Sequence, residues 1–199
     1  MESKRPDAPE ARELRRSLLQ AAARLFADQG YSATGVQQIT DAAGANKAML
    51  YYYFGSKEGL YDALIHDGLA GMEAAIEAAE APDAPLADRL HAFLTTYLTL
   101  VAERPELGRI IYRELLGAGE RARTVIAEQY ASNIRRLTAV LTEAQAGGTL
   151  RAVDPTLAAY DLFGMANMFI SSFFVTNRPL EVPVLATHIV DLFLRGAAA

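Results

Sequence analysis

Helix-forming segments separated by short breaks run through this sequence, and this pattern most constrains its fold. Ala, Leu, Glu and Arg, which favour helices, dominate the segments, whereas Gly, Pro, Asp and Asn gather in the breaks. No long run of β-branched residues alternates with polar residues, as a half-buried strand would require. The sequence therefore predicts an all-α fold of about nine helices, over residues 11–29, 35–43, 47–54, 57–80, 86–102, 105–117, 120–146, 155–176 and 182–196.

Composition excludes several classes of site. The chain has no Cys, so we expect no disulfides, iron–sulfur clusters or Cys nucleophiles. Its three His residues lie far apart without metal-ligand spacing, so we expect no metal and no cofactor. Residues 1–10 are polar and charged without the apolar core of a signal peptide, which predicts a disordered arm and a cytoplasmic protein. The apolar stretch from Leu162 to Val175 is shorter than the roughly 20 residues that cross a bilayer, so we expect a core helix and no membrane partner.

Charge is distributed unevenly along the chain. The formal net charge is −5, which argues against non-specific binding of nucleic acid. Residues 1–66 hold 8 basic and 8 acidic residues, so the acidity belongs to the larger C-terminal part. A DNA-binding N-terminal part is compatible with this distribution, although the charges alone do not indicate one.

Residues 35–54 have the pattern of a helix-turn-helix. Two short helices flank a tight turn at Gly44, and small residues before it allow the helices to cross closely. Thr34 and Gln37 have the spacing of a capping box for the first helix, and Asn46 is suited to cap the second. Ile39 and Leu50 are expected to face inward.

The second of these helices places polar and aromatic side chains on its outer surface. Three consecutive tyrosines cannot share one helix face, so at least one must be exposed, although the others can pack in the core. Tyr hydroxyls and Lys ammonium groups bind phosphates well, and side chains near the start of such a helix reach base edges. The expected outward residues are Lys47, Met49, Tyr51, Tyr52 and Tyr53.

The segment from Thr34 to Leu60, TGVQQITDAAGANKAMLYYYFGSKEGL, resembles the TetR family of bacterial transcriptional regulators. It is similar to the family pattern T-x-x-x-I-A-x-x-A-G-V-S-K-x-x-L-Y-x-Y-F-x-S-K-E-x-L, and residues 18–31 resemble the segment that precedes it. Thr40 replaces a small Ala, and Ala45 and Asn46 replace Val-Ser while keeping the roles of turn and cap. The resemblance covers residues 12–66; beyond them, only the number and length of the helices fit the family.

The resemblance implies a DNA-binding domain over residues 11–56 and a regulatory, ligand-binding and dimerisation domain over residues 57–199. It implies that Gln37 and Lys47 lie at the groove edge, with Met49 and Tyr51 toward bases or sugars. Tyr52 and Tyr53 would lie near the DNA backbone, and Lys57 would bind a phosphate at a helix N-terminus. Two alternatives stay open: Gln37 can be a capping partner only, and the basic residues near the N-terminus can be solvated or touch phosphates. These basic residues are Arg5, Arg12, Arg15 and Arg16.

A small-molecule pocket is expected among the helices between residues 57 and 176. Its candidate wall residues can equally be plain core, but their aromatic and Met content favours a hydrophobic or flat ligand. They are Met72, Phe93, Tyr97, Tyr112, Tyr130, Asn167 and Met168.

The helix over residues 155–176 is apolar on all sides, which predicts burial against the core and a second subunit. With the helix over 182–196 it would form a four-helix interface across a two-fold axis, whereas a monomeric core is the alternative. The candidate interface residues are Phe169, Phe173, Leu185, His188, Ile189 and Leu192.

These expectations combine into a homodimeric, ligand-responsive regulator, expected to be a repressor. It would bind a pseudo-palindromic operator in double-stranded DNA and leave it when a small-molecule effector binds the C-terminal domain. One alternative is a DNA-binding protein without an effector. The other is an enzyme or carrier that retains a helix-turn-helix, for which the sequence offers no nucleophile set or cofactor motif.

Overall fold

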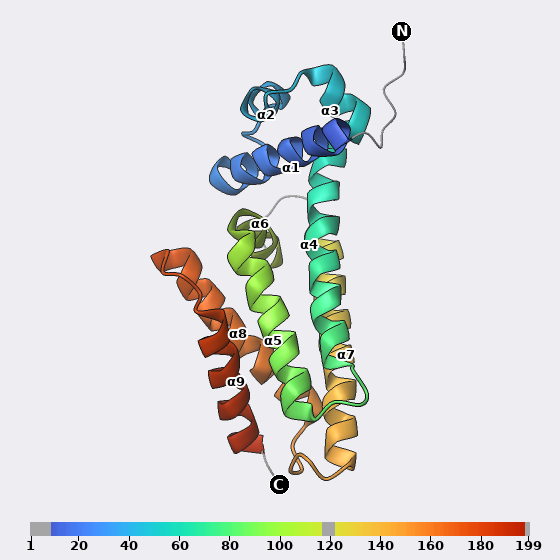
Figure 1. Ribbon diagram of the computed structural model, residues 1–199, viewed down its shortest axis with the longest axis vertical. Coiled ribbons are helices and arrows are strands. Elements are labelled where there is room, and N and C mark those ends of the chain that lie inside the picture. Colours follow the sequence, from blue (N-terminus) through green and yellow to red (C-terminus); the bar gives the residue numbers. More distant parts are fainter. Residues whose placement is uncertain (1–8, 117–121, 198–199) are drawn as a thin grey trace. The chain divides into compact units, whose positions relative to one another are not determined.

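The computed structural model describes residues 9–116 and 122–197, and this part of the chain forms nine α-helices (Figure 1). The prediction of an all-α fold is confirmed. The helices are α1 (Pro9–Gln29), α2 (Val36–Ala43), α3 (Lys47–Phe54), α4 (Lys57–Ala79), α5 (Leu86–Glu103), α6 (Pro105–Leu115), α7 (Arg123–Ala146), α8 (Pro155–Thr176) and α9 (Val182–Ala197).

The predicted helix ends differ slightly from those observed. Helix α1 begins at Pro9, within the predicted arm, and residues 1–8 of that arm lie outside the described residues. Helix α6 ends at Leu115, before the predicted end at residue 117. The predicted start of the next helix, at residue 120, falls outside the described part, and α7 begins at Arg123.

The chain divides into two compact units. The first contains the described residues up to Gly68 together with Glu106–Arg123, and the second contains Leu69–Pro105 and Thr124–Ala199 as far as they are described. Helix α4 therefore has residues in both units. This division reflects packing, and the division of function between residues 11–56 and 57–199 stays a prediction.

In the first unit, α1 packs against α2 and α3, and α2 packs against α3. Each helix contributes fully buried apolar side chains to this small core, among them Leu18, Phe26, Ile39 and Leu50. Burying such side chains stabilises the unit by roughly 1.5–3 kcal/mol each, so the hydrophobic effect positions the two short helices on α1.

The turn between α2 and α3 follows the prediction, but the cap of α2 does not. Gly44 has the left-handed conformation, with φ +63°, which lets α2 stop and the chain reverse within two residues. The prediction of a capping box between Thr34 and Gln37 is wrong: the N-cap is Gly35, whose N–H donates to Gln38 Oε1 at 2.7 Å. Thr34 is instead buried, and its hydroxyl donates to the carbonyl of Gly30 at 2.7 Å, which closes the end of α1.

Helix α6 packs within the first unit, although the sequence assigned it to the regulatory domain. Gly68 of α4 allows its close approach, because a Cβ there would lie 2.5 Å from Cδ1 of Ile111 and 3.2 Å from Cδ2 of Leu107. A guanidinium nitrogen of Arg113 donates to the carbonyl of Ala27 on α1 at 3.3 Å. Contacts between segments so distant in sequence leave no periodic signal, which is why the sequence did not predict them.

The second unit is a bundle of the rest of α4 with α5, α7, α8 and α9. Helix α5 packs against both α8 and α9, which also contact each other (Figure 1). The core of this unit is formed by fully buried side chains from every one of these helices, including Ile76, Leu90, Leu137, Phe163 and Ile189.

Candidate DNA-binding site and regulatory unit

Helix α3 presents several of the side chains that the sequence predicted for contact with DNA. Its N-cap is Asn46, whose side chain accepts a hydrogen bond from the backbone N–H of Met49 at 2.9 Å, as predicted. Lys47 is exposed, and Tyr51 and Tyr52 are 48% and 62% exposed. Large aromatic rings left at this exposure form a surface suited to a flat or phosphate-bearing partner.

The other predicted residues of α3 are partly buried. Met49 and Tyr53 are half-buried, and the Tyr53 ring lies 5.2 Å from the Tyr52 ring and 6.2 Å from the Phe54 ring, between centroids. The half-buried Tyr53 ring therefore packs edge-on against the exposed Tyr52 ring. Arg15 of α1 lies over the opposite end of this row, with its guanidinium carbon 5.3 Å from the Phe54 centroid.

Gln37 lies exposed on α2 and takes no part in the helix cap. Its side-chain amide donates to Oδ1 of Asp41, one turn further along, at 2.6 Å. The interpretation of Gln37 as a capping partner is therefore wrong, and its neighbour Gln38 has that role. Because Asp41 orients it, the Gln37 amide is fixed on the outer surface of α2.

Lys57, the first residue of α4, does not extend into solvent. Its ammonium donates to the backbone carbonyls of Tyr31 and Thr34, both at 3.0 Å, and lies 4.1 Å from the centroid of the Tyr31 ring. The Tyr31 hydroxyl in turn donates to Glu58 of α4 at 2.8 Å. The family resemblance implied a phosphate contact for Lys57, and no sequence pattern indicated these contacts, which join residues more than twenty positions apart.

The basic residues near the N-terminus differ in their surroundings. Arg5 lies outside the described residues. Arg16 forms an exposed ion pair with Glu13 of α1 at 2.7 Å. Arg12 and Arg15 lie on the same helix. The alternatives of solvation and phosphate contact stay open for these side chains.

A buried polar contact links α4 to α6 inside the first unit. The Tyr61 hydroxyl donates to Glu114 at 2.5 Å, and both side chains are almost fully buried. The Tyr61 ring packs edge-on against Tyr31 and Phe26, with centroids 5.0 and 5.2 Å away. Sequence reasoning missed this pair.

An aromatic cluster occupies the core of the second unit, where the sequence predicted a pocket. Phe163 of α8, which the sequence analysis did not select, lies at its centre, with the rings of Phe93, Tyr97 and Tyr130 at 5.2, 5.9 and 5.7 Å. The Tyr97 hydroxyl donates to Asn167 Oδ1 at 2.7 Å, which places one polar pair among these rings. Burial raises the pKa of the Tyr130 hydroxyl.

Not all of the predicted pocket residues come together. Met72 packs against the same core as Phe93, Tyr97, Tyr130 and Asn167. Tyr112, however, lies on α6 in the first unit, and Met168 is 69% exposed on the outer face of α8. The structure therefore does not place these two residues in the aromatic cluster, and their contact with a ligand stays a prediction.

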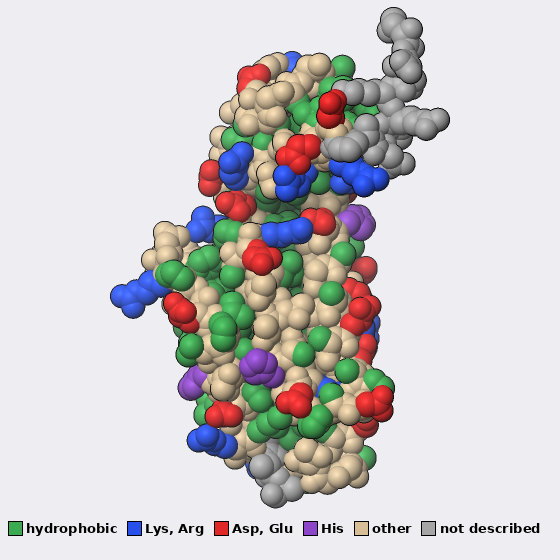
Figure 2. Space-filling model, viewed as in Figure 1, with side chains coloured by type: hydrophobic (Ala, Val, Ile, Leu, Met, Phe, Trp, Pro, Cys, Tyr) green, Lys and Arg blue, Asp and Glu red, His purple; other side chains and the backbone are tan. Residues whose placement is uncertain are grey.

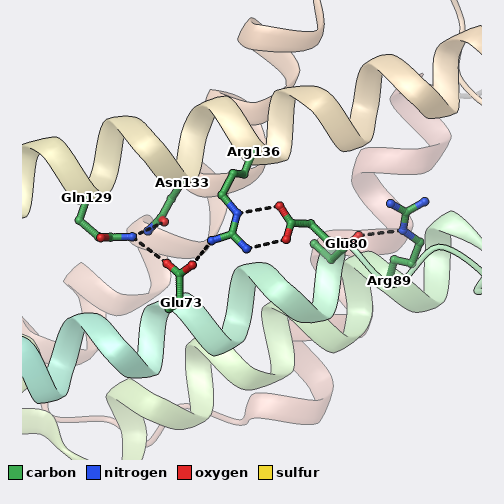
Figure 3. A network of polar contacts seen from close by, with 7 residues as sticks. Glu73, Glu80, Arg89, Gln129, Asn133 and Arg136 are labelled. Carbon is green, nitrogen blue, oxygen red and sulfur yellow. Dashed lines mark hydrogen bonds and ion pairs between the residues drawn. The ribbon is translucent and has the colours of Figure 1, made fainter.

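A network of polar side chains joins α4 to α7 in the second unit (Figure 3). The guanidinium of Arg136 donates to Glu80 at 2.6 Å from Nε, and also binds Glu73. Gln129 donates to both Glu73 and the buried Asn133, each at 3.0 Å.

Further along, the buried Arg89 of α5 donates to the carbonyl of Ala79 on α4 at 2.7 Å (Figure 3). The hydrogen bond between Arg136 and Glu80 raises the pKa of the Arg136 guanidinium and holds the pKa of the Glu80 carboxyl below its usual range. None of these residues was expected from the sequence, since each is an ordinary polar or charged residue at its own position.

Helices α8 and α9 expose large apolar side chains, and Figure 2 shows apolar side chains among charged ones on the surface of the second unit. The exposed residues are Leu157, Tyr160, Met168, Val175, Val184 and Leu192.

Of the predicted interface residues, Leu192 and His188 are exposed, and Phe169, Phe173 and Leu185 are half-buried. Ile189 is fully buried in the core of its own chain, so its selection as an interface residue is wrong. The helix over 155–176 is thus buried on one side and exposed on the other within one chain. A groove of about 650 Å³ lies along this face, lined by residues that include Tyr160, Gly164, Met168, Leu192 and Phe193.

Among the described residues, no group of three or more His, Asp or Glu side chains is placed to hold a metal ion. In the same part of the chain, α8 alone has the length and apolar composition of a membrane-crossing helix. One third of its 18-residue apolar stretch is buried inside the chain, and Leu162, Phe163 and Ala166 of this helix contribute to the core.

Comparisons with known proteins agree with this architecture. Residues 18–64 match the family described as bacterial regulatory proteins, tetR family, and residues 83–197 match the tetracyclin repressor-like C-terminal domain. The HTH-type transcriptional regulator RutR of Escherichia coli O157:H7 is 29% identical over 141 residues, which are 71% of this chain and 66%, just under two thirds, of RutR. The HTH-type transcriptional repressor NicS of Pseudomonas putida is 29% identical over 92% of this chain and 86% of its own length.

Among solved structures, AibR in complex with isovaleryl coenzyme A and operator DNA is similar to this chain with a TM-score of 0.71. The two are 28% identical, and the match covers 90% of this chain and 97% of AibR. The two family matches together span most of the chain, from the helix-turn-helix to α9. This chain therefore belongs to the TetR family of bacterial DNA-binding transcriptional regulators.

Proposed function

We propose that the protein is a homodimeric repressor that leaves a pseudo-palindromic operator when a small molecule binds its second unit. The observation that carries the DNA-binding part is the outer surface of α3, which offers Lys47, Tyr51 and Tyr52 on a short helix capped by Asn46. We propose that Gln37, Met49 and Tyr53 complete this contact surface. In functional terms, residues 11–56 would bind DNA and residues 57–199 would regulate binding.

The apolar face of α8 and α9 supports a homodimer. Exposed apolar side chains gathered on one face indicate an interaction surface. A helix-turn-helix protein gains affinity by binding two half-sites about 34–36 Å apart, which a two-fold dimer supplies. We therefore propose that this face, with Leu192 and His188 at its surface and Phe169, Phe173 and Leu185 beneath, contacts a second copy of the chain.

An acyl thioester is the effector class that we propose. AibR, 28% identical to this chain, has been solved with isovaleryl coenzyme A and operator DNA. The aromatic core around Phe163, with Met72, Phe93 and Tyr130, suits an apolar acyl chain, and the Tyr97–Asn167 pair offers a polar partner for a carbonyl.

Helix α4 is the element that we propose to couple effector and DNA. Its residues Lys57–Gly68 belong to the first unit and Leu69–Ala79 to the second. An effector changes operator affinity only if it binds the DNA-competent and DNA-free conformations with different affinity. A helix with residues in both units is suited to have a different position in the two conformations.

Selection of genomic DNA tests the proposal. Purified protein is mixed with fragmented genomic DNA of the source organism at a stated salt concentration, and the bound fragments are sequenced. We expect sharp enrichment of an inverted repeat whose half-sites are one or two helical turns apart. A well-folded protein that enriches no sequence would contradict the proposal.

The enriched repeat then allows the effector to be tested. Fluorescence anisotropy of the labelled repeat follows DNA release as short-, medium- and long-chain acyl coenzyme A are added, with free coenzyme A as control. We expect release by an acyl form and not by free coenzyme A. If no acyl form releases the DNA, the proposed effector class is wrong, and a DNA-binding protein without this regulation becomes the better interpretation.

A further inference from the structure

The ammonium of Lys57 is largely used within the protein. A lysine ammonium has three N–H donors, and two of those of Lys57 bind the carbonyls of Tyr31 and Thr34. The same charge lies 4.1 Å from the centroid of the Tyr31 ring, within the range of a cation–π contact. Hydrogen bonds that involve a charged group are stronger than those between neutral groups, so breaking both of these bonds to free the ammonium for a phosphate would be costly.

The two carbonyls belong to the turn that leads into the helix-turn-helix. Residues 31–34 connect the end of α1 to Gly35, the N-cap of α2. Besides Lys57, the turn is held by the hydrogen bond from the Tyr31 hydroxyl to Glu58 at 2.8 Å. The first two residues of α4 thus hold Tyr31 at its backbone and at its hydroxyl.

This arrangement determines how α2 begins. The chain leaves the turn at Thr34, whose hydroxyl is buried against the carbonyl of Gly30, and enters α2 directly. Because α3 packs on α2, a change in the direction of the turn would change the position of the exposed face of α3 as well.

We infer that Lys57 acts on operator affinity as a positioning residue, by fixing the turn before α2, and not as a ligand of a DNA phosphate. This inference rests on the proposed function, and it separates Lys57 from Lys47. Lys47 is exposed at the start of α3 and remains a candidate for direct contact with DNA.

The salt dependence of binding distinguishes the two roles. Each lost phosphate contact makes the slope of log affinity against log salt shallower by about 0.9, and each subunit of a dimer would lose one contact. The experiment compares the wild type, Lys57→Met and the matched control Lys47→Met on the enriched repeat, by anisotropy at several salt concentrations. We expect Lys57→Met to lower affinity by tenfold or more with the wild-type slope, and Lys47→Met to give a shallower slope.

A second measurement without DNA tests the position of α2. Hydrogen exchange at the Ile39 amide, which donates to the carbonyl of Gly35, should be faster in Lys57→Met than in the wild type or Lys47→Met. A purely stabilising role would leave the affinity of the folded protein unchanged, so binding is measured well below the melting temperature.

Lys57→Arg covers the case in which Lys57→Met does not fold. Arg keeps the charge that a phosphate would need, but its planar group does not reproduce a compact ammonium between two carbonyls. We expect lower affinity with the wild-type slope. A shallower slope in Lys57→Met, or wild-type affinity in either Lys57 variant, would overturn the inference. If the wild type itself enriches no DNA, the proposed function fails, and unchanged exchange at Ile39 in Lys57→Met would then overturn the positioning role.

Discussion

At the scale of single residues, the two exposed tyrosines of α3 offer aromatic surface that a partner can contact. Tyr52 is the more exposed of the two and rests against the half-buried Tyr53 ring. A tyrosine in this position keeps its apolar ring outside the core, where it contributes little to folding. Its ring and hydroxyl are therefore available for DNA.

We predict that Tyr52→Ala lowers affinity for the enriched repeat by about tenfold, or about 1.4 kcal/mol, without changing the melting temperature. Anisotropy titration and thermal melting measure the two effects. Tyr52→Phe is the matched control, since it removes only the hydroxyl and so separates a phosphate hydrogen bond from ring packing. Unchanged affinity in Tyr52→Ala would remove this residue from the DNA-binding surface.

The sequence predicted which of these side chains are exposed, but it did not predict the hydrogen bonds of the residues around them. Lys47, Tyr51 and Tyr52 are exposed as expected, because helical periodicity determines which side faces the core. The N-cap of α2 is Gly35, one residue after the predicted Thr34. The Thr34 hydroxyl instead donates to the buried carbonyl of Gly30, a contact that residue spacing does not indicate. The carbonyl partners of Lys57 were missed for the same reason.

At the scale of helices, the α4–α7 network makes a prediction about pH. Arg136 lowers the pKa of Glu80 from its ordinary value of 4.5. A carboxylate with a lowered pKa stabilises the fold fully above its unfolded pKa, and this contribution is lost as the pH falls through the lowered, folded pKa.

We predict that Glu80→Gln lowers the free energy of unfolding by about 0.5–1 kcal/mol at pH 7, a small effect because the pair is partly exposed to solvent. The difference from the wild type should shrink below about pH 4. Urea unfolding between pH 3 and 7 measures it, with Glu77→Gln as control, since Glu77 is exposed near the end of α4, three residues before Glu80. A difference that persists undiminished at pH 3 would show that Glu80 acts through packing and not through its charge.

The helices themselves were predictable because residue types near their ends mark where they start or stop. Asn46 caps α3 and Gly44 lies at the turn after α2, as their residue types suggested. At the start of α4, the Ser56 hydroxyl accepts a hydrogen bond from the Gly59 amide. The packing of α6 was not predictable, since Glu114 and Tyr61 are separated by 53 positions. The aromatic cluster was predicted in part, without its central residue Phe163.

At the scale of the whole molecule, the proposed dimer would form through the apolar face of α8 and α9, so this face would determine whether two half-sites can be bound together. A charge placed in the centre of such a face is desolvated without a partner when two copies meet. The same charge on the free chain remains in water.

We therefore predict that Leu192→Glu, at a position 55% exposed in the chain, raises the dimer dissociation constant at least 100-fold while the chain stays folded. Sedimentation at several concentrations measures the dissociation constant, and circular dichroism reports folding. Val125→Glu, on α7, is the matched control, since Val125 is an exposed apolar residue outside this face. A dimer that is equally stable in Leu192→Glu would place the interface elsewhere.

Gly164 gives the sharpest prediction about this face. It lies exposed in the middle of α8, where Gly costs a helix about 1 kcal/mol relative to Ala. A Cβ at Gly164 would meet no atom within 4 Å in its own chain, unlike Gly68 and Gly71, whose Cβ atoms would collide with neighbouring side chains. Nothing in the chain itself therefore requires Gly164, whereas a second copy that closely approaches the groove beside it would.

Gly164→Ala should accordingly stabilise the monomer and weaken the dimer. We expect a free energy of unfolding for the monomer raised by up to about 1 kcal/mol, measured in the Leu192→Glu background, and a dimer weakened several-fold in the otherwise wild-type chain. Gly164→Leu should abolish dimerisation while leaving the monomer folded. If Gly164→Ala stabilises monomer and dimer alike, the two copies do not approach at this residue, and the groove beside it is free for another occupant.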